Sequence, residues 1–237
     1  MKIPLMMHAV AIAMAAGSAH ADIIVNGSFE LNPSGIAWSG PYGNYGGWIR
    51  LAPGTTYLTG WTVGGFGPGG PPGVDWHLGV SPYTPGAAKD GFRMIDLNID
   101  GAGGQGPGQG TISQSFATNV GTRYRMSFWL SGPISGAHGG TLNPRSVNVD
   151  LTGIATTTFT APASNPDNLI WYQQQLTFAA TASLTTLMFS PLPNTHNAGY
   201  WGAFIDDVKV EVVPAPSSVA FIGLGVLLAV RRRTKTD

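Results

Sequence analysis

Two adjacent aspartates, Asp206 and Asp207, stand near the start of a segment that otherwise has the composition of an apolar strand, AFIDDVKVEV at residues 203–212. Its three valines alternate with charged residues, the period-2 pattern of a half-buried β-strand. Extending that alternation backwards predicts that Phe204 and Asp206 face the buried side and that Asp207 faces solvent. Because an unpaired buried carboxylate costs several kcal/mol, the pattern predicts a partner for Asp206.

A second kind of chemistry would use paired carboxylates. Asp75, Asp96 and Asp100 are available as the general acid and the base or nucleophile of glycoside hydrolysis, which lie about 5–10 Å apart in a cleft. Their spacing along the chain does not place them relative to one another. A polysaccharide-acting hydrolase that uses two of these loop aspartates is therefore our alternative prediction of function.

The remaining candidates for catalysis do not form a recognisable set. The histidines lack the convergent spacing with other ligands that a zinc site needs. Ser135 lies in the sequence GPISG, which differs from the GxSxG nucleophile elbow. We therefore predict that the protein is not an enzyme.

Aromatic residues on polar loops offer a binding chemistry instead. One group lies in the Gly- and Pro-rich stretch 37–49, and a pair precedes the last strand. Their rings would stack on sugars, or they would hold long loops against the domain, and the sequence leaves both alternatives open. The candidates for carbohydrate binding are Trp38, Tyr42, Tyr45, Trp48, Tyr200 and Trp201.

Composition and charge bound the class of protein. Only 10% of the 237 residues are charged, 43% are hydrophobic, and glycine and proline are abundant, which suits an all-β domain with many turns. Between Asp22 and Val213 there are seven Lys and Arg against eleven Asp and Glu, a net charge of −4 with no basic stripe. Nucleic-acid binding is therefore not expected. Because there is no cysteine, the fold is held by its core, with or without a metal.

The N-terminal residues have the tripartite pattern of a secretory signal peptide. Residues 1–21 contain one lysine, an apolar run and the cleavage motif Ala19-His20-Ala21. We expect this segment to form the signal helix, to be removed on export, and to leave a mature chain that begins at Asp22.

The C-terminal residues 213–237 have the pattern of a sorting tail. Val219–Val230 is an apolar stretch that would form a helix of roughly 18 Å, shorter than the hydrocarbon core of a bilayer. The basic cluster that follows fits retention on the cytoplasmic side of a membrane. The residues of the predicted sorting motif are Val213, Pro214, Ala215 and Pro216, with Arg231, Arg232 and Arg233 behind the helix.

This tail resembles the PEP-CTERM signal of exported bacterial proteins, although Ala215 stands where that signal has glutamate. The resemblance implies transient anchoring in the inner membrane through the short helix. It also implies cleavage near Pro214–Pro216 by a protease of the exosortase type. The protein would then remain in the cell envelope, on the cell surface or outside the cell. The alternative is a plain C-terminal anchor.

Short apolar segments follow one another through residues 22–212, separated by clusters of glycine, proline and asparagine. Two very Gly-rich stretches, 64–73 and 101–110, are expected to be surface loops. The pattern predicts an all-β domain of about ten strands, a two-sheet antiparallel sandwich of the jelly-roll kind. The expected strands are 23–25, 58–63, 74–78, 92–97, 111–117, 122–131, 146–151, 156–160, 170–178, 184–189 and 204–212.

Short motifs follow one another in a fixed order along residues 22–212. Their residues are Asn26, Gly27, Phe29, Glu30, Trp61, Asp75, Trp76, Asp96, Gln114, Phe116, Gly121, Tyr124, Phe128, Ile205, Asp206 and Asp207. This order resembles the galactose-binding-like β-sandwich, and in particular the "choice-of-anchor" exported domains, which are related to carbohydrate-binding modules. The resemblance implies that the first and last strands lie side by side. It also implies an exported envelope or extracellular-matrix protein that binds extracellular polysaccharide or has a structural role.

The same resemblance implies a structural Ca²⁺ between these two strands. Its ligands would be Glu30 and one of Asp206 and Asp207, with backbone carbonyls near Asn26 or Ser28, oxygen donors of the kind that calcium prefers. The alternative is a carboxylate that accepts backbone N–H groups in the turn at Asn26–Ser28, or one that pairs with a cation such as Arg93.

Overall fold

The computed structural model describes residues 22–31, 47–65, 72–78, 88–99, 108–132, 144–164, 168–192 and 202–214. The predicted signal peptide, the tail beyond Pro214 and five of the six aromatic candidates lie outside these residues; those five are Trp38, Tyr42, Tyr45, Tyr200 and Trp201. Among the described residues, no helix is long and apolar enough to cross a membrane.

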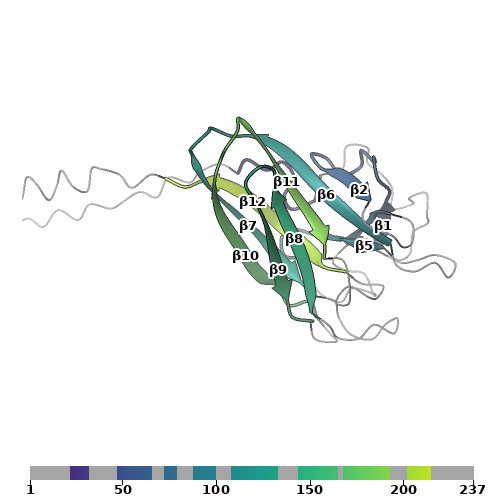
Figure 1. Cartoon of the computed structure of the whole chain (residues 1–237). Helices are drawn as coiled ribbons and strands as arrows, with labels where there is room; N and C mark the ends of the chain where they lie inside the picture. The colour runs from purple at the N-terminus through teal and green to yellow at the C-terminus, as the bar shows by residue number, and fades with distance from the viewer. Residues whose placement is uncertain are drawn as a thin grey trace, which may run out of the picture.

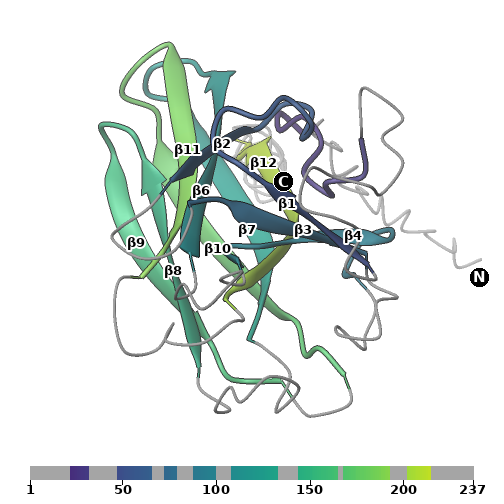
Figure 2. The same cartoon turned by 90° about the vertical axis from the view of Figure 1, so that its right-hand side faces the viewer.

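The described residues form two antiparallel sheets, as predicted (Figure 1). The first sheet has the order β1 (Trp48–Leu51), β3 (Val74–Leu78), β4 (Arg93–Asp96), β12 (Phe204–Val212), β7 (Arg123–Ser131) and β10 (Tyr172–Ala179). The second has the order β2 (Thr62–Gly65), β6 (Gly108–Ala117), β11 (Leu184–Pro191), β8 (Arg145–Leu151) and β9 (Ala155–Ala161), and β5 (Asn98–Ile99) pairs with β6. Figure 2 shows the sheets as two layers.

The core fills the space between the two sheets because every other side chain of each strand points inward. On β7 the inward residues are the predicted ones, Tyr124, Met126, Phe128 and Leu130, all buried. Phe128 joins the layers: its ring meets Phe189 of β11 edge-on at 5.0 Å between centroids.

Two expectations about strands are wrong. Strand β1 lies at the end of a stretch whose Gly and Pro content predicted a loop. The Gly-rich stretches also contribute to strands, since Gly64 and Gly65 belong to β2 and Gly108–Gly110 belong to β6. At Gly110 the physical reason is close approach, because a Cβ atom there would overlap the backbone carbonyl of Gly73.

The N-terminal segment lies beside the last strand, as the resemblance implied, although it forms a turn where 23–25 was expected to be a strand (Figure 2). The Ile23 N–H donates to the Val210 carbonyl at 2.9 Å, and the Val208 N–H donates to the Gly27 carbonyl at 3.0 Å. A side chain at position 27 would overlap the Val208 carbonyl, so only glycine fits there.

The alternation predicted for the last strand is broken by a β-bulge. The register between β12 and β7 shifts between Asp206 and Lys209, and Asp207 has φ 50°, in the left-handed region. Because the bulge inserts one residue, Val208 faces the core whereas Asp206 faces the outer side of the first sheet. Asp206 is buried as predicted, but beneath a turn on that outer side and outside the main core.

Candidate binding face on the outer side of the first sheet

The outer side of the first sheet divides into a buried part and an open part. Across β1, β3, β4 and β12, one row of outward residues consists of Arg50, Asp75, Asp96 and Phe204, and all of them are buried. Toward β7 and β10 the outward side chains become exposed.

The buried part holds two of the three aspartates of the alternative hydrolase prediction; the third, Asp100, lies outside the described residues. Asp75 and Asp96 are strand residues directly opposite each other on β3 and β4, which corrects their placement in loops. Arg50 pairs with Asp75, with 3.4 Å between Nε and Oδ1. Asp96 accepts the N–H groups of Asn98 at 2.8 Å and Gly202 at 2.9 Å. Each carboxylate thus already has structural partners.

Trp48, the one aromatic candidate that the structure describes, also belongs to this buried part. It is only 7% exposed, and its ring stacks on His77 with 5.7 Å between centroids. Burial lowers the pKa of His77 to about 3, so this ring is neutral at physiological pH. The position of Trp48 agrees with the packing alternative for the aromatic residues.

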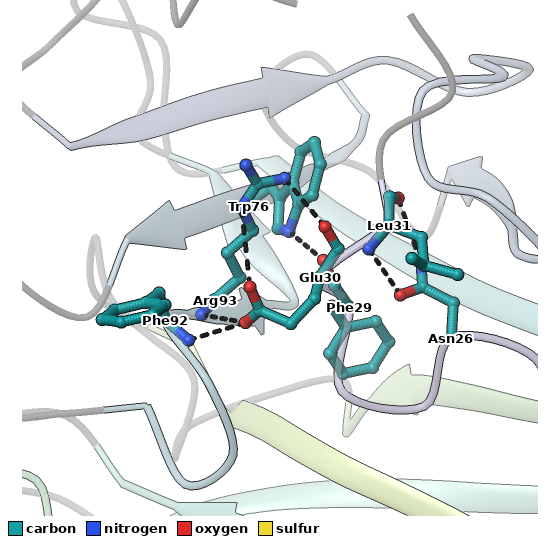
Figure 3. Close-up of polar contacts among 7 residues, drawn as sticks. All are labelled: Asn26, Phe29, Glu30, Leu31, Trp76, Phe92 and Arg93. Carbon is teal, nitrogen blue, oxygen red and sulfur yellow. Dashed lines mark hydrogen bonds and ion pairs between the residues drawn. The ribbon is translucent and has the colours of Figure 1, made fainter. Parts of the chain in front are cut away.

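A single turn, residues 88–93, covers the boundary between the two parts, and Glu30 holds one end of it (Figure 3). The Glu30 Oε1 atom accepts the N–H groups of Phe92 at 2.7 Å and Arg93 at 2.6 Å. The Arg93 side chain lies against the ring of Trp76 and donates to the Glu30 carbonyl at 3.3 Å. Gly91 has φ 70°, and a Cβ atom there would crowd the Glu30 carboxylate.

Asp206 holds the other end of the same turn. Its Oδ2 atom accepts the N–H groups of Lys89 at 2.6 Å and Asp90 at 2.9 Å, and its Oδ1 atom accepts that of Asp207 at 2.7 Å. Burial raises the pKa of Asp206 to about 8, although the three N–H groups act in the opposite direction. The predicted alternative of backbone N–H donors therefore describes this carboxylate, with the donors at residues 89, 90 and 207 in place of the turn at Asn26–Ser28.

The residues present fit a calcium ion only in part. Asn26 is turned to other partners, because its carbonyl accepts the Trp61 indole N–H at 2.9 Å. Asp207 forms an ion pair with Lys209. Among the described residues no three His, Cys, Asp or Glu side chains are grouped to hold a metal. Of the predicted ligands, only Glu30 and Asp206 reach the same turn, and their oxygens there accept backbone N–H groups that a bound cation would have to replace. Within the described residues, no hydrogen bond joins Ser28 to either carboxylate.

The turn places Lys89 over the open part of the sheet. The Lys89 Nζ atom lies 3.8 Å from the centroid of the Trp129 ring, a cation–π contact. Trp129 is directly opposite Asp206 on β12, so the carboxylate that binds the Lys89 N–H also flanks the indole. On its other side, Trp129 is opposite Gln173 of β10.

Further polar side chains lie near this indole on the open part of the sheet. Gln173 and Gln175 of β10 are exposed, and Gln175 is opposite Ser127, which is itself opposite Lys209. We call this surface the Trp129 face; it consists of Lys89, Ser127, Trp129, Gln173, Gln175 and Lys209. It combines one half-buried aromatic ring with amide, hydroxyl and ammonium groups.

Sequence reasoning missed Trp129 although the signal was present. Arg123, Arg125, Ser127 and Trp129 alternate with the core residues of β7, so Trp129 is a large aromatic residue on the polar side of an amphipathic strand. The contribution of Lys89 had no such signal, because it depends on the turn that Glu30 and Asp206 hold.

The described structure is thus a two-sheet antiparallel β-sandwich with a polar, aromatic-centred face on its first sheet. The family described as "Protein of unknown function (DUF642)" matches residues 83–211, slightly more than half of the chain, and the chain belongs to this family. No curated protein matches the sequence.

Two solved cyclase structures share the fold at low sequence identity, and a third structure is less similar. A crystal structure of the Stig cyclase Fisc from Fischerella sp. TAU, in complex with a pyrrolidinylidene indole, is 17% identical over 84% of this chain and 100% of that chain, with a TM-score of 0.56. A cyclase from Fischerella sp. TAU with 4-(1H-indol-3-yl)butan-2-one is 17% identical over 83% and 100%, with a TM-score of 0.52. The module TmCBM61, solved with β-1,4-galactotriose, is 18% identical over 65% and 90%, with a TM-score of 0.40.

Proposed function

We propose that this protein is an exported, non-catalytic polysaccharide-binding protein, and that the Trp129 face is its binding site. The observation that supports the proposal is the position of Trp129, half-buried between Asp206 and the exposed Gln173 on an otherwise polar surface. Half-burial orients the ring while leaving part of it open to a ligand.

The chemistry of this face suits a sugar. A pyranose ring presents C–H groups on one side, which pack on an indole, and hydroxyl groups around its rim. The side-chain amides of Gln173 and Gln175 have both donors and acceptors, so each can bind a hydroxyl in either role. The Lys89 ammonium lies over a face of this ring, so a sugar that packs on that face would displace it or meet its three N–H donors there.

A specific observation also bears on the alternative, a polysaccharide-acting hydrolase. Asp75 and Asp96 are adjacent across two strands, which is the kind of pairing that a glycosidase needs. Both are buried, however, and both already serve as acceptors for Arg50 or for backbone N–H groups. These partners favour a structural role and support the non-catalytic proposal.

The proposal also includes export and sorting, which are supported by the sequence patterns at the two ends of the chain. The protein would lose residues 1–21, pass through a stage anchored in the inner membrane, and be cut in its tail by an exosortase-type protease. It would then act in the envelope, on the cell surface or in the extracellular matrix, where polysaccharide is its expected partner.

Affinity electrophoresis of the purified protein through gels that contain soluble galactan, xylan, mannan or alginate tests the proposal. We expect at least one polysaccharide to retard the protein and Trp129→Ala to weaken that interaction at least tenfold, which corresponds to about 1.4 kcal/mol. Phe92→Ala is the matched control, because it removes a more exposed ring from the neighbouring turn.

If Trp129→Ala leaves the retardation unchanged, the binding site lies elsewhere and the assignment of this face is overturned. Release of reducing ends from the retained polysaccharide, abolished by Asp75→Asn or Asp96→Asn, would establish the hydrolase instead. Thermal melting of each variant separates loss of binding from loss of fold.

A further inference from the structure

Both sheets end on the same flank of the sandwich. The last strand of the first sheet is β10 and the last strand of the second is β9, and in the described part of the chain no strand pairs with the outer edge of either. The two edges are neighbours, because β10 pairs with β7, and Phe128 of β7 contacts Phe159 of β9 edge-on at 5.3 Å (Figure 1).

These two edges lack the features that usually protect an open strand. Strand β10 has the sequence YQQQLTFA and β9 has ATTTFTA, with no charged residue and no proline in either. The edge strands on the opposite flank have features that protect against pairing with another chain, since β1 and β2 have only four residues each and β1 carries Arg50. An open strand edge presents unpaired N–H and C=O groups, so a long uncharged one is a template for another strand.

We propose that β9 and β10 together form an interface with the same two strands of a second copy of this protein. The two copies would be related by a two-fold axis normal to both layers. Strand β10 would then pair antiparallel with β10 of the second copy, and β9 with β9 of the second copy. Both sheets would continue into the partner. A self-pairing edge must avoid placing like charges opposite each other, and these strands carry none. This interface does not depend on polysaccharide binding.

The surface area of this flank determines the affinity that we expect for the dimer. Eight residues of strand extend over roughly 27 Å, and two layers of about 10 Å each are together about 20 Å thick, which gives a flank of roughly 500 Å² per partner. That is below the approximately 800 Å² of a standard interface, so the dimer is expected to be weak and concentration-dependent.

Sedimentation velocity of the purified protein between about 1 and 500 μM tests the proposal, with two substitutions at the middle of the edge strands. In a centred two-fold pairing, Gln175 of β10 and Thr158 of β9 would each lie next to their own copies. Gln175→Lys and Thr158→Lys would then bring like charges together, and we expect each to raise the dimer Kd by up to about fivefold. Thr62→Lys, the same change on the exposed side of edge strand β2, is the matched control and is expected to leave Kd unchanged.

A protein that stays monomeric throughout this range would overturn the proposal. So would a dimer that Thr62→Lys weakens as much as Thr158→Lys does. Melting temperatures of the three variants show whether the fold is intact.

Discussion

Glu30 and Asp206 lie far apart in the sequence, yet they hold opposite ends of one turn. Asp206 accepts the N–H groups of Lys89 and Asp90, and Glu30 accepts those of Phe92 and Arg93. The N-terminal segment and the last strand are thereby linked through a third segment that carries Lys89 to the Trp129 ring. The carboxylates predicted to be metal ligands thus have a positioning role for the proposed binding face.

The first prediction concerns the stability that Glu30 contributes. Glu30→Ala removes two charge-assisted hydrogen bonds, which together would contribute about 3–6 kcal/mol if buried. Because the Glu30 side chain is 29% exposed, we expect a smaller loss of about 2 kcal/mol. For a domain of this size that lowers Tm by roughly 4–8 °C in a melting experiment. Glu211→Ala is the control: its ion pair with Arg125 is exposed and should be worth under about 1 kcal/mol. Equal losses in the two variants would mean that the turn is not held by Glu30.

The second prediction concerns processing. Asp22, the expected first residue of the mature chain, is already part of the fold, because its Oδ1 atom accepts the Val210 N–H at 3.0 Å. From this contact and from the sorting-tail pattern of residues 213–237, we expect intact-mass measurement of protein from its native host to give a chain that starts at Asp22 and lacks residues 219–237. A mass that still includes Arg231–Arg233 would contradict sorting-tail cleavage and support a plain anchor.

Sequence reasoning was most successful where a local pattern decides the structure. The alternation of β7 identified its four core residues, and β3 was predicted with its observed bounds. The two-sheet arrangement followed from many short strands separated by turn residues.

It failed where distant segments decide the structure. The bulge at Asp207 depends on how β12 pairs with β7, and this pairing moved Asp206 to the outer side of the sheet. Likewise, Gly110 is in a strand because it pairs with Gly65 of β2, and the close approach of the Gly73 backbone leaves no room for a side chain there. Neither contact can be predicted from the residues that neighbour it in the sequence.

The third prediction tests the structural calcium. If an ion joins Glu30 to Asp206, a hundredfold excess over Kd stabilises the fold by about 2.7 kcal/mol, so a chelator should lower Tm by roughly 5–11 °C. Glu30→Gln should abolish this response. The backbone N–H donors on both carboxylates support the alternative, in which chelator and calcium leave Tm unchanged. An unchanged Tm would end the calcium proposal.

The last prediction concerns the ionisation of the buried Asp206 side chain, measured in the presence of chelator. Its pKa is raised to about 8 in the folded protein, whereas an unfolded aspartate titrates near 3.9. Between these values the folded state binds a proton that the unfolded state does not. The stabilisation is therefore complete below about pH 4 and is lost as pH rises through 8.

His77 has the opposite effect at lower pH. Its pKa is lowered to about 3, so between that value and its ordinary value of 6.5 the unfolded state binds the extra proton. The Asp206 contribution should thus be clearest between pH 6.5 and 8.5, where urea midpoints of the wild type should fall as pH rises.

Asp206→Asn removes the titrating group, so its midpoints should change less over this interval even though the variant is less stable overall. Asp90→Asn changes an exposed carboxylate in the same turn while keeping its backbone N–H, and should retain the wild-type slope. If Asp206→Asn and the wild type have parallel profiles, Asp206 is charged in the folded protein throughout this range, and its burial is compensated by the N–H groups of Lys89, Asp90 and Asp207.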